Sequence, residues 1–149
     1  ERTPMIRPMT IDDYDAVCAC CMSCTGMGLN TIDDSRDGIA KYLARNPTTC
    51  FVDERDGRIT GVIIAGHDGR RGYIYHTAVS PDHRHQGIGT ALVEAALHAL
   101  TDEGIAKVAL VVFARNADGN AFWQRLGFTS RDDLTYRNKA LAELTRIDT

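Results

Sequence analysis

The spacing of apolar positions changes along the chain between a period near 3.6 and a period of 2, which predicts a mixture of helices and strands. In the first half this pattern predicts one strand, two helices and three further strands: 5–9, 10–24, 33–47, 49–54, 59–68 and 70–79. Thr10 with Asp13 three positions later is a weak capping box for the first helix. Asp56-Gly57 is typical of a hairpin turn, so the three later strands are expected to form an antiparallel meander.

The second half begins with a long helical pattern and ends with short strand-like pieces. The predicted elements are a helix, a strand, a short helix and two final strand pieces with a turn at Asp132-Asp133: 89–104, 105–114, 116–127 and 128–141. The run 105–114 is rich in β-branched residues and fits a strand buried on both faces. The helix 89–104 connects this strand to the strand 70–79, and such a crossover is expected to be right-handed and to leave the two strands parallel. The pattern thus predicts one mixed α/β domain over residues 1–149, in the order βααβββαβαββ.

Composition narrows the class of protein. The chain has 149 residues, of which 44% are hydrophobic and 25% charged, as expected of a folded globular protein. Its formal net charge of -3 gives no basic footprint for nucleic acid. A membrane span needs about 20 consecutive apolar residues, and the apolar runs are far shorter. No secretory signal is evident, so a cytoplasmic location without a membrane partner is expected.

Four of the five cysteines crowd into the stretch CACCMSC, and two interpretations compete for them. Cys21-x-x-Cys24 has the spacing of a zinc ligand pair, and Cys18 and Cys20 could complete a cluster. The alternative is that all four are small buried hydrophobes on an amphipathic helix in a reducing compartment. No second pair of Cys or His ligands exists in the chain, which favours the second interpretation and predicts no metal.

The stretch VSPDHRHQGIGTALVEAAL, residues 79–97, places two glycines where a long helix must begin. Glycine there is unfavourable for the helix but leaves the first unpaired amides open, and a helix N-terminus attracts phosphate. The glycines could instead serve tight packing of the helix on the sheet. The known nucleotide motifs do not fit, because Leu92 replaces the third glycine of a dinucleotide fingerprint and no GK[ST] follows.

At these residues the chain resembles the GNAT N-acetyltransferase superfamily. The signature V-x-P-x-x-R-x-x-G-x-G/A-x-x-L is matched at six positions: Val79, Pro81, Arg84, Gly87, Gly89 and Leu92. A second stretch, NADGNAFWQRLGF, resembles N-x-x-A-x-x-x-Y-x-x-x-G-F, with Asn116, Gly127 and Phe128 in place. Gly119 and Trp123 depart from that second motif, where the family commonly has Ala and Tyr.

The resemblance implies a fold, a cosubstrate and a set of contacts. It implies a central mixed, mostly antiparallel sheet with one parallel, splayed strand pair and helices on both faces. It implies acetyl-CoA as the acyl donor, with the pantetheine arm lying in the splay and the pyrophosphate on the helix amides. The binding residues carried over are Ala78, Val79, Ser80, Arg84, His85, Gln86, Gly87, Ile88, Gly89, Thr90, Asn116, Phe122 and Trp123.

Acyl transfer to an amine sets the chemical requirements of the site. A lysine-like amine with a pKa of about 10.4 costs roughly 4.6 kcal/mol to deprotonate at pH 7. A main-chain N–H next to Val79 is expected to stabilise the thioester oxygen as it becomes an oxyanion. Direct attack in a ternary complex is the expected route, because positioning alone lowers the barrier by several kcal/mol.

The groups that move protons are not fixed by the motif. Because Trp123 cannot act as the usual acid, Tyr136 is one candidate for protonating the leaving thiolate, beside water or unassisted departure. His76 is a candidate base, with ordinary strand packing and a water chain as alternatives. Strict alternation puts Tyr73 and Tyr75 on the face of Val79, with His76 opposite.

Two functions fit these residues. The first is an N-acetyltransferase acting on a primary amine of a small molecule or a protein. The second is an acyl-CoA-binding or sensing module on the same fold with weak catalysis, which the Trp123 substitution keeps open. The acceptor pocket is expected around residues 24–34, where Asp33 and Asp34 serve either as caps or as contacts for a cationic substrate. A homodimer is a further possibility that the resemblance implies.

Overall fold

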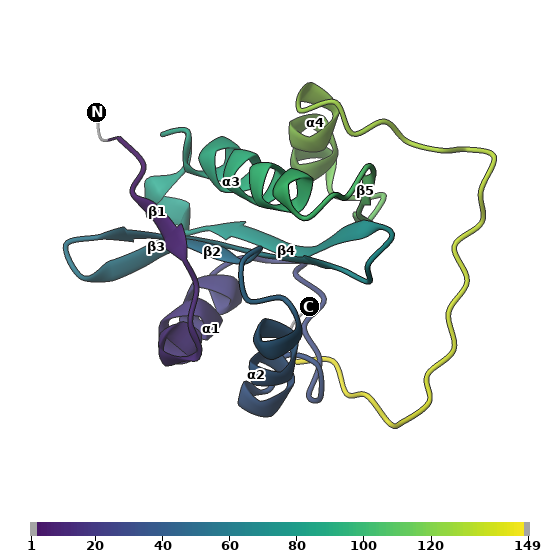
Figure 1. Cartoon of the computed structure of the whole chain (residues 1–149), viewed down its shortest axis with the longest axis horizontal. Coiled ribbons are helices and arrows are strands. Elements are labelled where there is room, and N and C mark those ends of the chain that lie inside the picture. Colours follow the sequence, from purple (N-terminus) through teal and green to yellow (C-terminus); the bar gives the residue numbers. More distant parts are fainter. Residues whose placement is uncertain (1–2, 148–149) are drawn as a thin grey trace.

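The computed structural model describes residues 3–147, which form one five-stranded sheet with helices on both faces (Figure 1). The strands are β1 (Ile6–Pro8), β2 (Phe51–Arg55), β3 (Arg58–His67), β4 (Gly72–Val79) and β5 (Val108–Ala109). The helices are α1 (Tyr14–Met22), α2 (Arg36–Arg45), α3 (Ile88–Asp102) and α4 (Ala117–Arg125). Short 3-10 turns span Ile11–Asp13 and Pro81–His83. The predicted element types are confirmed through α4.

The sheet has the order β1-β2-β3-β4-β5, with antiparallel pairing except between β4 and β5. The parallel pair is joined through α3, as a crossover requires. In Figure 1, α1 and α2 cover one face of the sheet, and α3 and α4 cover the other. The mixed, mostly antiparallel sheet with one parallel pair is therefore confirmed.

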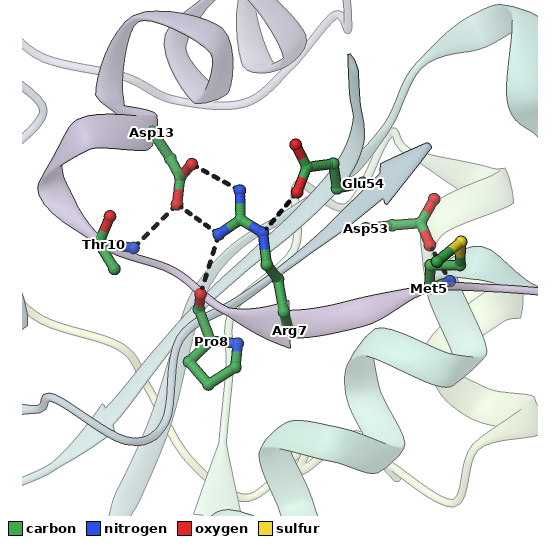
Figure 2. Close-up of polar contacts among 7 residues, drawn as sticks. All are labelled: Met5, Arg7, Pro8, Thr10, Asp13, Asp53 and Glu54. Atoms are coloured by element: carbon green, nitrogen blue, oxygen red, sulfur yellow. Dashed lines mark hydrogen bonds and ion pairs between the residues drawn. The ribbon is translucent and has the colours of Figure 1, made fainter. Parts of the chain in front are cut away.

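Strand β1 is held in place by Arg7, which bridges two other elements (Figure 2). Its guanidinium donates to both carboxylate oxygens of Asp13, at 2.8 and 2.9 Å, and to Glu54 on β2 at 2.7 Å. The Arg7 bonds and the main-chain N–H of Thr10 lower the pKa of the Asp13 carboxyl. The expected contact between Thr10 and Asp13 is present, but the helix it begins is a 3-10 turn that leads into α1.

Two apolar clusters hold the helices to the sheet. The cluster beneath α1 and α2 includes the buried side chains Val17, Cys20, Cys21, Ile39, Leu43, Val62 and Ile64. The cluster beneath α3 and α4 includes Ile63, Ile74, Ile88, Leu92, Val93 and Ala96. Gly61 lets α3 approach the sheet closely, because a Cβ there would lie 2.9 Å from Ile88 and 3.0 Å from Leu92. This close contact fixes the start of α3 over the end of β4.

A β-bulge in β4 changes which side chains face each cluster. The register with β3 pairs Ile64 with His76 and Ala65 with Ile74, so Tyr75 is the extra residue. As a result Tyr75 makes an edge-to-face contact with Tyr42 of α2, while Val79 packs in the α3 cluster. The prediction that Tyr73 and Tyr75 share the face of Val79 was wrong, because strict alternation fails at the bulge.

The C-terminal third of the chain departs from the predicted strands. Only Val108 and Ala109 of the predicted strand 105–114 pair with β4, and Val111 is 59% exposed rather than buried. Residues 128–141 form no strand. β-branched residues favour an extended backbone, but a strand also needs a neighbouring strand, and within residues 3–147 these segments have none beyond the short β4 pairing. Within that same range no helix is long and apolar enough to cross a bilayer.

Candidate functional site

The last residues of β4 have an outer edge that pairs with no strand, although side chains bond to the Val79 carbonyl on it. β5 pairs only with Gly72 and Tyr73, whereas β4 continues to Val79. The N–H of Ser80 bonds to Thr60 on β3 at 2.8 Å, so alternation turns the main-chain groups of Val79 away from β3. No strand among the described residues covers that edge. The divergence of β4 and β5 thus leaves the Val79 N–H available to a ligand that lies along the strand.

Directly after this edge, α3 begins with an open N-terminus. Gly87 is the cap residue and has φ 80°, in the left-handed region that favours glycine, and His85 also has a positive φ of 63°. The first helical bond runs from Ala91 N–H to the Gly87 carbonyl at 3.0 Å. No side chain of the described residues caps this end. The amides of Ile88, Gly89 and Thr90 therefore point out of the helix without helical partners.

The two glycines of the motif have different structural reasons. A Cβ on Gly87 would meet nothing within 4 Å, so packing does not require glycine there. A Cβ on Gly89 would lie 3.3 Å from the Phe122 ring and 3.7 Å from Val79. Packing thus explains Gly89, whereas Gly87 serves the turn and an accessible helix start.

Arg84 and Cys24 meet at the carbonyl oxygen of Val79. Arg84 donates to that oxygen from Nε at 3.2 Å, and the Cys24 thiol lies 3.4 Å from the same oxygen. Arg84 also reaches the Cys24 sulfur with a second nitrogen at 3.4 Å. Arg84, one of the binding residues that the resemblance implies, therefore ties the end of β4 to the residues just after α1. Sequence reasoning missed Cys24, because its neighbour Val79 is distant along the chain.

Asn116 caps α4 through its side chain. Its Oδ1 accepts the N–H of Gly119 at 2.9 Å, which leaves the Nδ2 group as a donor for a ligand. A Cβ on Gly119 would lie 2.5 Å from Nδ2, so the departure from the family's Ala fits this compact cap. The two remaining carried-over aromatics, Phe122 and Trp123, are half-buried against the α3 cluster. Trp123 makes edge contacts with Phe122 and Phe128, at ring distances of 4.9 and 5.2 Å.

His76 lies under the first two helices and not at the open edge of β4. Its Nε2 bonds to Asp34 at 2.8 Å, with side-chain exposures of 11% and 10%, and its Nδ1 is buried without a partner in the described part of the chain. Both residues line a cavity of about 20 Å³ together with Tyr14, Val17, Cys18, Cys21, Leu29, Ile39 and Ile64. Asp34 therefore bonds to His76, a contact that the position of Asp34 near a helix start did not predict.

The tyrosines form a separate group beside α2. Burial, followed by the proximity of Tyr136, raises the pKa of Tyr73 above its usual value. Burial, Asp33 and Tyr136 together raise the pKa of Tyr75. Tyr136 itself is 68% exposed and belongs to no strand. The candidate acid is therefore near the β4 tyrosines but is not enclosed with them.

The cysteines lie in the core beneath α1 and α2. Cys20, Cys21, Cys24 and Cys50 are buried and Cys18 is half-buried, and all five are free thiols. Burial raises the pKa of Cys20 to about 11 and that of Cys50 to about 12, so these thiols stay protonated near neutral pH. Within residues 3–147, no three or more His, Cys, Asp or Glu side chains gather closely enough to hold a metal ion.

Comparison with known proteins agrees with this arrangement. A statistical model of the "Acetyltransferase (GNAT) family" matches residues 18–128, which include both the β4 edge and the start of α3. This chain is a member of the GNAT acetyltransferase family. Acetyltransferase SG1711 of Sodalis glossinidius (strain morsitans) is 30% identical over 138 residues, which is 93% of this chain and 96% of that protein.

Solved GNAT structures share the fold. The PaiA N-acetyltransferase of Thermoplasma acidophilum, in complex with coenzyme A, superposes with a TM-score of 0.76 at 18% identity, over 88% of this chain and 92% of that one. The aminoglycoside acetyltransferase meta-AAC0020 from an uncultured soil metagenomic sample, in complex with sisomicin, gives a TM-score of 0.74 at 19% identity, over 93% and 97%. At these identities the structural likeness establishes only the fold of this GNAT protein.

Proposed function

We propose that this GNAT protein transfers the acetyl group of acetyl-CoA to a primary amine, by direct attack within a ternary complex. The observation that carries the proposal is the continuity of two open main-chain surfaces. The Val79 N–H lies on an edge that no strand of the described residues covers, and residues 80–87, which include the 3-10 turn Pro81–His83, lead from it to the uncapped amides of Ile88, Gly89 and Thr90. An extended amide-bearing arm fits the first surface, and a pyrophosphate fits the second.

The residues present fit coenzyme A on three counts. The space at the Cβ position of Gly87 is open, so nothing among the described residues crowds that side of the helix start. The Asn116 Oδ1 atom is used by the cap of α4, so its Nδ2 group is the donor that would remain for the pantetheine arm. The PaiA relative was solved in complex with coenzyme A on this fold. Support for the proposal therefore comes from the local geometry and from the family together.

The chemical step uses few protein groups. The neutral amine attacks the thioester carbon, the C–S bond breaks, and the coenzyme A thiolate leaves with the amine's proton passing to water. The Val79 N–H is proposed to hold the developing oxyanion. His76 is proposed to hold the segment before α2 against β4 and not to take the proton of the amine. Its Nε2 is bonded to Asp34, and its side chain lies on the face of the sheet opposite that of Val79.

The acceptor amine belongs to a small molecule or to a protein. An aminoglycoside acetyltransferase and ribosomal-protein-alanine N-acetyltransferases share the fold, so both acceptor classes occur on it. Asp33 and Asp34 bond to Asn30 within their own loop, so the structure gives no support to a cationic contact through them.

A weakly catalytic acyl-CoA-binding module is the second candidate, and Trp123 is the observation that favours it. The indole occupies the position of the family's usual acid and packs between two phenyl rings, so it supplies no titratable proton. Such a module would bind acetyl-CoA as tightly as an enzyme does but release no thiol when amines are added.

The test measures binding by calorimetry and thiol release with a panel of small amines and amine-bearing peptides. Two matched variants separate binding from folding: Gly87→Val at the start of α3 and Gly104→Val just after its end. Both glycines have positive φ, 80° and 82°, and neither would place a Cβ within 4 Å of another group. Both variants should lose stability to a similar extent, on the order of 1–2 kcal/mol.

Only Gly87→Val should weaken acetyl-CoA binding, by tenfold or more, because only it places a side chain over the open amides. Equal affinities for the two variants would remove the basis of the proposal. Tight binding to the unmodified protein without thiol release from any amine would replace the enzyme with the binding module.

A further inference from the structure

Four tyrosines from three separate segments gather beside α2. This tyrosine group consists of Tyr42 on α2, Tyr73 and Tyr75 on β4, and Tyr136 in the segment after α4. The centre of the Tyr75 ring lies 4.6 Å from that of Tyr73 and 5.7 Å from that of Tyr42. Tyr136 lies near enough to both β4 tyrosines to raise the pKa of each. The group is thus assembled by the fold and not by one stretch of sequence.

Two rings of the group face solvent, and a β-bulge turns one of them outward. Tyr75 is 58% exposed and Tyr136 is 68% exposed. Tyr75 is the extra residue of β4 where the pairing with β3 shifts, and such bulges re-aim a side chain next to active sites. Several exposed aromatic rings in contact with one another are characteristic of a surface that binds a ligand or a partner.

The charge that acts on these rings is negative. Asp33 raises the pKa of Tyr75, and no positively charged side chain within residues 3–147 acts on this pKa in the opposite direction. Because Asp33 is itself bonded to Asn30 at 3.1 Å, it contributes its field and not a direct contact. The rings beside it therefore form a surface that favours a cation.

Elsewhere in the protein, aromatic rings are covered by arginines of the same chain. Arg36 lies 5.9 Å from the centre of the Tyr14 ring. Arg115 and Arg146 lie 4.3 and 4.8 Å from the centre of the Phe113 ring. Among the described residues, no arginine or lysine lies over a ring of the tyrosine group in this way. The faces of these four rings are therefore available to a cation from outside the chain.

The tyrosine group stands at the closed end of the splay between β4 and β5. Tyr73 pairs with Ala109, and from there to Val79 no strand of the described residues covers the outer edge of β4. The rise of a strand puts Tyr75 roughly 13 Å from Val79 along β4. A molecule whose reacting amine lies at the proposed oxyanion contact of Val79 therefore reaches the tyrosine group only if it is elongated.

We propose that the acceptor is an elongated aliphatic amine with a second positive charge, and that the tyrosine group holds this second charge through cation–π contacts. The inference rests on the proposed acetyl transfer and names its class of substrate. The field of Asp33 attracts a cationic tail, leaves a neutral one unaffected and repels an anionic one. A small diamine, with one ammonium group at each end of a flexible chain, fits both the charge and the length of this surface.

Binding of choline tests the tyrosine group without requiring acetyl transfer. Choline and its neutral carbon isostere dimethylbutanol share one shape, so the comparison isolates the charge. In an NMR titration, choline should bind the unmodified protein at least about fivefold more tightly than dimethylbutanol. Tyr75→Leu should remove this preference, whereas Tyr75→Phe should keep it because the ring is retained. Leu141→Ala, which changes a 95% exposed side chain outside the group, is the control and should keep it as well.

The length and the charge of the acceptor test the class of substrate. Thiol release from acetyl-CoA is measured with diamines from ethylenediamine to octanediamine and with amino alcohols of the same lengths. The long diamines should exceed the matched amino alcohols in kcat/KM by about fivefold or more, and the shortest should not. Tyr75→Leu should abolish this ratio. Because the ratio is taken within one protein, a general loss of activity or of folded protein in the variant cancels.

Three results would each overturn the inference. They are equal binding of choline and dimethylbutanol, equal use of long diamines and amino alcohols, and a lysine-bearing peptide that is acetylated faster than every diamine. Selective binding of choline without thiol release from any amine would instead support the cation site and refute the proposed acetyl transfer. The failure of the inference and the failure of the proposed function are thereby distinguished.

Discussion

Arg84 donates a hydrogen bond from its Nε atom to the main-chain oxygen of Val79 at 3.2 Å. This bond spans the 3-10 turn Pro81–His83, so it fixes the distance between the end of β4 and the approach to α3. The Cys24 thiol joins the same oxygen at 3.4 Å and links both to the end of α1. One side chain thereby sets the relative position of the two open main-chain surfaces on which the proposed function depends.

Arg84→Ala should therefore raise the KM for acetyl-CoA more than it lowers kcat. Loss of a charged donor at this position is worth about 1.4 kcal/mol, or tenfold in KM. Steady-state kinetics with acetyl-CoA as the varied substrate measure both constants. Arg58→Ala, an exposed arginine at the start of β3, is the control, and equal behaviour of the two variants would contradict the prediction.

His76→Gln should destabilise the protein without changing the pH dependence of kcat/KM. The bond to Asp34 is nearly buried, and loss of such a bond costs about 1.5–3 kcal/mol when one partner is charged. Asp34→Asn should have a similar effect, whereas Asp33→Asn should have little, because Asp33 is exposed. Urea unfolding gives the stability, and pH–rate profiles give the catalytic readout. Loss of a limb of the profile in His76→Gln would show that His76 is the base after all.

Gly119→Ala should weaken both the cap of α4 and the binding of acetyl-CoA. The added Cβ would lie 2.5 Å from the Asn116 Nδ2 atom, so the side chain must rotate out of its cap position. A lost cap costs about 1 kcal/mol, and the proposed pantetheine contact is lost with it. Thermal unfolding and calorimetry measure the two effects, with Asp118→Ala as the neighbouring control. If the affinity for acetyl-CoA is retained although the cap is lost, Asn116 does not contact the coenzyme.

Acid should destabilise the anchor of β1 through Asp13. Its pKa is lowered in the folded protein, chiefly by the bond to Arg7, so its contribution is present above the unfolded pKa of about 3.9. That contribution is lost as the pH falls through the lower folded value. Because Arg7 is partly exposed, the effect is about 1 kcal/mol.

Urea unfolding at pH 7 and at pH 3 tests this dependence. Asp13→Asn should be less stable than the unmodified protein at pH 7, and the difference should shrink at pH 3. Asp12→Asn, one residue earlier in the same turn, serves as the control. A difference that stayed constant between the two pH values would contradict the assignment.

Local signals in the sequence were enough to predict that a helix begins at the glycine motif of α3. The positive φ of Gly87 belongs to a single position in a recognisable motif, and it is tolerated because glycine lacks a Cβ. The order of elements through α4 also followed from periodicity, because each of those elements packs on a neighbour in the same sheet.

Features that depend on a distant partner were not predictable in this way. The bulge at Tyr75 is visible only once β4 is aligned with β3, so the faces of Tyr73 and Tyr75 were reversed. Asp34 meets His76 because α2 folds over β4, and no spacing in the chain marks that contact. The predicted final strands failed for the same reason, since extended propensity does not specify what a strand pairs with.

The contact between Gly89 and Phe122 couples the position of α4 to the first turn of α3. With the phenyl ring seated against the first turn of α3, any tilt of α4 would press on the backbone that carries the open amides. We therefore expect position 122 to favour a flat side chain of similar size. A tighter or looser fit between these two helices should change the affinity of the start of α3 for an anion, even though residue 122 need not touch the anion itself.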